Sequence, residues 1–112
     1  MIADIAKTVI AVLILTAVCF QASAQQAVSV SISVKNHRFQ PAEIHAPAKV
    51  PIELHVKNLD PTPMEFESVS LRVEKVVTGN SEGVIRLRPL EAGSYNFFDD
   101  FNPQTTGVLV VR

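Results

Sequence analysis

Apolar and polar residues alternate with a period of two in several short segments of this chain. In residues 28–34, valine and isoleucine alternate strictly with serine, and residues 52–57 alternate in the same way with glutamate, histidine and lysine. This period places one face of a β-strand in a core and the other in solvent. Further strands are predicted at residues 43–45, 72–77, 84–88, 95–97 and 108–111. No window shows the 3.6-residue period of an amphipathic helix, so the pattern predicts an all-β domain.

Residues that favour turns separate these segments, for example Asn58-Leu59-Asp60-Pro61 and Thr78-Gly79-Asn80. Short strands at this spacing predict a Greek-key β-sandwich. Leu90, Gly93 and Tyr95 have the spacing of a tyrosine corner, in which the phenol hydroxyl bonds to upstream backbone. We therefore expect a structural role for Tyr95, the only tyrosine.

The first 24 residues have the order of a secretory signal peptide. Lys7 gives a positive charge, residues 9–20 are apolar, and Ala22-Ser23-Ala24 offers a small-residue cleavage site. The sequence predicts a signal peptide at 1–24 and one exported, periplasmic domain at 25–112. The alternative is an uncleaved membrane anchor, for which the apolar run is short of the roughly 20 residues needed.

Charge and cysteine content limit the chemistry of the mature domain. The chain has 10 basic and 11 acidic residues with no basic stripe, so nothing favours nucleic acid as a partner. Contact with the membrane is expected only through partners or an uncleaved signal. The only cysteine, Cys19, would leave with the signal peptide. The mature domain would then hold no disulfide, thiolate ligand or thiol nucleophile.

Three stretches of the chain together resemble the cupredoxins: residues 35–44 (KNHRFQPAEI), residues 65–76 (EFES with Leu71 and EKV), and residues 95–103 (YNFFDDFNP) with Gly107. The resemblance runs from about residue 28 to Arg112. Within that fold the chain is similar to the periplasmic cupredoxin-like subunits of bacterial iron-uptake systems. It implies a cupredoxin-like sandwich with an iron permease and a small periplasmic iron-binding protein as partners.

The resemblance also implies where copper would bind. Cupredoxins use one histidine after a proline, and a cysteine, a histidine and a methionine from the last loop. Here the matching positions hold Met64, Asp99, Asn102 and Thr105. The chain also departs from the iron-associated members, which carry an acidic residue at 64 and a histidine at 102. The expected copper ligands are absent, so we expect no type 1 copper and no blue copper electron transfer.

Other candidate ligands converge at the same end of the implied sandwich. Glu67 and Asp99 are the leading candidates for metal ligands, with Met64, Glu65 and His37 as further members. Carboxylates suit iron, manganese, magnesium or calcium, whereas a methionine thioether suits Cu(I). The set therefore implies an iron site, or a combined iron and copper site. The alternative is that these carboxylates are solvated loop charges.

Two functional hypotheses follow. In the first, the protein is a periplasmic accessory that binds or presents iron, or copper, for an iron permease. It would be a binding protein, with at most an accessory, ferroxidase-type role in Fe(II) oxidation. In the second, it is a metal-free β-sandwich that docks partner proteins, which the missing histidines favour.

Overall fold

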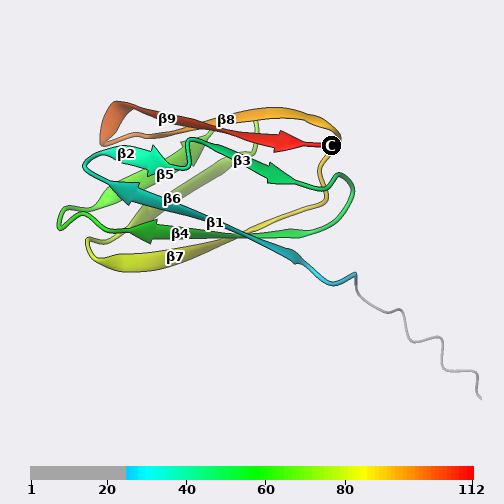
Figure 1. The fold of residues 1–112 in the computed structure, drawn as a ribbon, viewed down its shortest axis with the longest axis horizontal. Helices are drawn as coiled ribbons and strands as arrows, with labels where there is room; N and C mark the ends of the chain where they lie inside the picture. The colour runs from blue at the N-terminus through cyan, green and yellow to red at the C-terminus, as the bar shows by residue number, and fades with distance from the viewer. Residues whose placement is uncertain (1–24) are drawn as a thin grey trace, which may run out of the picture.

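The computed structural model describes residues 25–112, and the predicted signal peptide at 1–24 lies outside the described residues. Nine strands form two sheets that pack face to face (Figure 1). The strands are β1 (Val28–Lys35), β2 (Arg38–Gln40), β3 (Glu43–Ala46), β4 (Ile52–Asn58), β5 (Met64–Ser68), β6 (Val73–Val77), β7 (Ser81–Leu87), β8 (Gly93–Asp99) and β9 (Asn102–Val111). Within residues 25–112 there is no helix of the length and apolar character that crossing a membrane requires. The predicted all-β sandwich is confirmed.

The chain passes repeatedly between the two sheets. One sheet has the order β2-β1-β4-β7 and the other β3-β9-β8-β5-β6. β1 runs parallel to β4 and β3 parallel to β9, while the other neighbours are antiparallel. As a result, the ends of β1, β4 and β8 and the starts of β5 and β9 meet at one end of the sandwich, on the left in Figure 1. We call this the loop end.

Inward-facing residues from both sheets fill the core. Its centre holds three phenylalanine rings, in which Phe97 lies 4.9 Å from both Phe39 and Phe66 between ring centroids. Gly107 is opposite Phe97 on β9. A Cβ at Gly107 would lie 2.4 Å from a ring carbon of Phe97, so only glycine lets the ring pack flat against the strand.

Two strands and several boundaries differ from the sequence-based prediction, most of all the start of β9. The sequence-based prediction omitted β2, which has three residues, and β5, whose five residues do alternate between inward and outward positions. β9 begins at Asn102, six residues before the predicted start at Val108. Its first half is polar, and its one buried hydroxyl, on Thr105, donates to the carbonyl oxygen of His37. This polar stretch pairs through the backbone and has no apolar pattern.

The tyrosine corner is present as predicted. The Tyr95 hydroxyl donates a hydrogen bond to the carbonyl oxygen of Glu91, with an O–O distance of 2.7 Å. The ring itself packs against the core. The bond therefore fixes the connection that leads from β7 in one sheet to β8 in the other.

Replacing Tyr95 with phenylalanine should destabilise the domain while leaving its fold intact. The substitution removes one neutral hydrogen bond, worth about 1 kcal/mol in the free energy of unfolding. For a domain of this size, thermal denaturation should then show a melting temperature lower by about 4–8 °C. An unchanged melting temperature would show that the bond does not stabilise this connection.

Candidate functional site

Strand β5 divides the predicted ligands between two faces of the five-stranded sheet. Met64 and Phe66 point into the core and are 2 % and 0 % exposed, whereas Glu65 and Glu67 point outward and are half-buried. Adjacent strand residues face opposite sides, so the Met64 thioether lies across the strand from both carboxylates. The structure therefore does not bring the soft sulfur donor and the hard oxygen donors of β5 together.

Three carboxylates meet on the outer face of this sheet near the loop end. Glu65, Glu67 and Asp100 each offer a carboxylate oxygen within 4.8 Å of the others. Asp100 is positioned by its backbone N–H, which donates to the carbonyl oxygen of Glu65 at 2.9 Å. Glu74 lies directly opposite Glu67 on β6. We call Glu65, Glu67, Glu74 and Asp100 the carboxylate group.

Within residues 25–112 the carboxylate group has no ion pair with a lysine or arginine, although Arg72 borders a hollow with Glu67 and Glu74. Desolvation raises the pKa of Glu67, and the charge of Asp100 and hydrogen bonding with Glu74 raise it further. Desolvation followed by the charges of Asp100 and Glu74 raises the pKa of Glu65 in the same direction. A bound cation would relieve this repulsion.

Asp99, one of the two leading candidates, faces the interior instead. Its side chain is fully buried and accepts three hydrogen bonds, from the backbone N–H groups of Glu65 and Phe101 at 3.0 Å and from the side-chain amide of Asn102 at 3.2 Å. The carboxylate thus joins the start of β5 to the turn between β8 and β9. It does not belong to the carboxylate group.

His37 lies at the loop end but outside the carboxylate group. Asn36 and His37 form the two-residue turn between β1 and β2, and both have positive φ, as in a type I′ turn. Their backbone N–H groups donate to the Asp60 carboxylate at 2.7 and 2.9 Å. These bonds, that of His37 first, lower the pKa of Asp60. The imidazole of His37 is exposed, with Nδ1 3.9 Å from Asp60.

The four positions that match copper ligands do not fit a type 1 copper centre. They offer neither thiolate nor imidazole, and three are used in the protein's own hydrogen bonds. Among residues 25–112, no buried polar side-chain atom lacks a partner. These positions therefore act as structural supports at the loop end.

The sequence pointed to Asp99 as a ligand, whereas the structure places Asp100 and Glu74 beside Glu67. The alternation of inward and outward residues on β8 could have shown that Asp99 faces the interior. Phe97 points inward, and Asp99 lies two residues further along the strand on the same face. The same rule turns Asp100 away from the interior.

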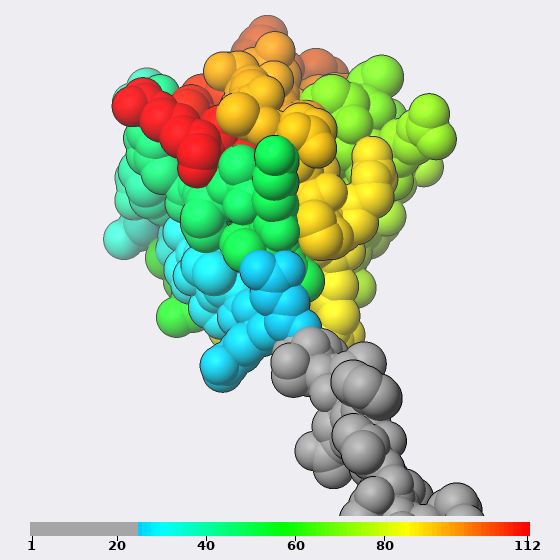
Figure 2. Space-filling model, turned by 90° about the vertical axis from the view of Figure 1, so that its right-hand side faces the viewer, coloured from blue at the N-terminus to red at the C-terminus, as the bar shows by residue number. Residues whose placement is uncertain are grey.

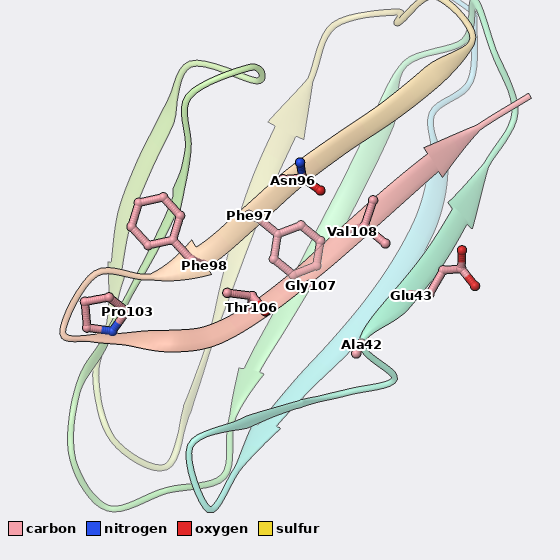
Figure 3. Close-up of a pocket in the computed structure, with 9 residues that line it drawn as sticks. All are labelled: Ala42, Glu43, Asn96, Phe97, Phe98, Pro103, Thr106, Gly107 and Val108. Carbon is pink, nitrogen blue, oxygen red and sulfur yellow. The ribbon is translucent and has the colours of Figure 1, made fainter.

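The outer face of the five-stranded sheet also has an apolar hollow, and Figure 3 labels the residues that line it. It has a volume of ≈ 700 Å³, and its apolar lining includes Phe98, Pro103 and Val108. Glu43 borders it on β3, and Phe98 pairs with Glu67 on the opposite side. The outward positions of the five described strands hold no lysine or arginine. The hollow thus lies between two acidic borders.

Known proteins share this fold. A family model described as cupredoxin-like domain matches residues 8–111. An uncharacterized protein of Rickettsia prowazekii (strain Madrid E) is 38% identical over 84 residues, which cover 74% of this chain and 67% of that protein.

Solved structures are similar over most of the described domain. The metal binding domain of the Cu(I) exporting P-type ATPase CopA of Streptococcus pneumoniae, solved with Cu(I), has a TM-score of 0.68 and 21% identity, covering 75% of this chain and 84% of that chain. Auracyanin A, a blue copper protein of Chloroflexus aurantiacus, has a TM-score of 0.65 and 14% identity, covering 78% and 100%. At these identities the likeness shows the fold. Because the family model spans nearly all of the sequence and the two-sheet architecture agrees with it, the chain belongs to the cupredoxin-like domain family.

Proposed function

We propose that this protein is an exported metal-binding accessory that carries iron on the carboxylate group of its five-stranded sheet. The observation that supports this most directly is the approach of oxygens from Glu65, Glu67 and Asp100 to within 4.8 Å of one another. Desolvation first, and then the charge of Asp100, raise the pKa of both glutamates, which supports a site where a counter-ion is favourable. A multivalent cation supplies that counter-ion.

The donor chemistry favours iron over copper as the cargo. All members of the carboxylate group are hard oxygen donors, which suit iron but not Cu(I). The one soft donor among the predicted ligands, Met64, is 2 % exposed in the core on the opposite face of β5. Hard oxygen donors bind Fe(III) more tightly than Fe(II). The site would therefore make it easier for an external oxidant, such as dioxygen, to take an electron from bound Fe(II).

The pathway in this proposal follows from the resemblance described above. A signal peptide at 1–24 would place the domain in the periplasm, beside an iron permease and a periplasmic iron-binding protein. The carboxylate group supports such a role because it lies on the outer face of a sheet, with Asp100 exposed. A cation held there is accessible to a partner, so the domain would present iron and not enclose it.

Glu67→Gln tests this proposal in the mature domain. Iron at 100 times its dissociation constant should raise the melting temperature of the wild-type domain by on the order of 10 °C. Glu67→Gln should abolish this rise. Without metal the same variant should melt slightly higher than wild type at neutral pH, because the raised pKa means that the charged form of Glu67 disfavours the folded state there. This difference should shrink as the pH falls towards the ordinary glutamate value.

A matched control is Glu91→Gln, which removes the same charge from an exposed position outside the carboxylate group. It should leave the iron effect unchanged. Calorimetry that detects no iron binding to the wild type, or an equal iron effect in Glu67→Gln, would contradict the proposal. Asp99 is unsuitable for this test because its substitution removes three structural hydrogen bonds.

The apolar hollow favours a second candidate function, the metal-free docking module. The hollow exposes Phe98 and Val108 between acidic borders, on a sheet face without lysine or arginine among the described outward positions. Charge complementarity therefore selects a partner segment that carries apolar residues interspersed with lysine or arginine. In this function the carboxylates would bind the partner's cations.

A peptide of alternating lysine and leucine can test the docking function in the absence of metal. NMR titration should shift the amide signals of Asn96, Phe98 and Val108, and Thr106→Lys should weaken binding about tenfold by placing a cation in the hollow. Ser31→Lys, an equally exposed strand position on the other sheet, should have no effect. Equal shifts on both sheets, or equal binding of a glutamate–leucine peptide, would exclude this function.

A further inference from the structure

A second hollow lies away from the loop end, where β5 turns into β6 and β7 ends. It has a volume of ≈ 230 Å³. Figure 2 shows the two segments beside each other, the β5–β6 turn in yellow-green and the end of β7 in yellow. Its lining includes three arginines and three buried leucines: Arg72, Arg86, Arg88, Leu71, Leu87 and Leu90.

The three arginines around this hollow have no acidic partner. Within residues 25–112, no carboxylate oxygen comes within 4.0 Å of Arg72, Arg86 or Arg88, and no acidic residue lines the hollow. Guanidinium groups stay charged at neutral pH, so three like charges border one small space. The buried leucines beneath them keep water away from one side, which strengthens any interaction with an anion.

The acidic residue paired with Arg86 across the sheet is already engaged by a histidine. Glu53 lies directly opposite Arg86 in the pairing of β4 with β7. Its carboxylate, however, is 2.9 Å from Nε2 of His55, while Nδ1 of His55 is 2.6 Å from Glu82. Two carboxylates on the two ring nitrogens favour the imidazolium, and the hydrogen bond to Glu82 is the main cause that raises the pKa of His55. Because His55 binds Glu53, Arg86 forms no ion pair with the glutamate that lies opposite it on β4.

Arg72 is held beside the hollow by a fixed turn. It adopts a φ of 56°, in the left-handed region that few residues other than glycine occupy. The turn is closed by a hydrogen bond from its backbone N–H to the carbonyl oxygen of Val69, and by one from Leu71 N–H to the Ser68 hydroxyl, both 3.2 Å. The Leu71 side chain is 3 % exposed. The position of Arg72 is therefore built into the fold.

We propose that this arginine hollow binds a phosphate group. A tetrahedral oxyanion offers several oxygens to the planar forks of Arg72, Arg86 and Arg88 at once, which a single carboxylate cannot do. The phosphate group has two sources, free inorganic phosphate and the headgroup of an anionic phospholipid. The lining of the hollow shares no residue with the carboxylate group, although Arg72 also borders a neighbouring hollow with Glu67 and Glu74.

Inorganic phosphate is the first probe. Titration of the mature domain, followed by NMR against chloride at equal ionic strength, should give saturable shifts at Leu71, Leu87 and the arginine side chains. Arg72→Gln and Arg88→Gln should each weaken binding about tenfold, the effect of losing a charge-assisted hydrogen bond. Arg38→Gln, an exposed arginine on β2, loses the same charge elsewhere and should bind as wild type.

Vesicles distinguish the two sources. Phosphatidylglycerol vesicles that sediment with wild type and Arg38→Gln, but not with Arg72→Gln or Arg88→Gln, would assign the site to a lipid headgroup. Phosphate binding without vesicle binding would assign it to free phosphate. The proposal is overturned if neither probe binds, or if all four proteins bind alike, since that result reflects net charge alone. Circular dichroism confirms that each variant is folded.

Discussion

The buried carboxylate of Asp99 is the interaction on which the loop end depends. A charged group with no exposed surface is costly unless its lone pairs are hydrogen-bonded. Here two backbone N–H groups and one side-chain amide meet that demand, and they come from β5 and from the β8–β9 turn. The same bonds fix the backbone of Glu65 against Asp100. The buried Asp99 thus holds the backbone segments that carry Glu65 and Asp100 on the outer surface.

The sequence predicts the sandwich because most strands bury one face and therefore alternate visibly. Residues 28–34 and 52–57 are strands in the structure, and Tyr95 forms its corner. The pattern fails where backbone pairing forms a strand without apolar alternation. The three residues of β2 and the polar first half of β9 are examples. Both are held by pairing with a neighbouring strand, and Thr105 of β9 also donates a hydrogen bond to the carbonyl oxygen of His37.

The candidate site was predictable by region but not by residue. Residues two positions apart on a strand point to the same face, so the sequence predicts that Glu65 and Glu67 lie together. The structure confirms this. The choice between Asp99 and Asp100 depends on which side chain supports the β8–β9 turn. One of the three donors to Asp99, the backbone N–H of Glu65, is 34 residues away in the sequence. The position of Met64 follows from the same alternation that groups the glutamates, which places sulfur and oxygen donors on opposite faces.

The network at positions 99, 102 and 105 has a consequence for how such a domain changes over evolution. A cysteine at position 99 would supply a thiolate, but it would also remove the acceptor for Glu65, Phe101 and Asn102. Histidine at 102 would act on the same bonds. The side chain at position 99 cannot both accept these hydrogen bonds and bind copper, so building a copper centre here would need several simultaneous substitutions. Each single substitution towards such a centre would first remove a structural hydrogen bond, so the intermediate proteins would be less stable.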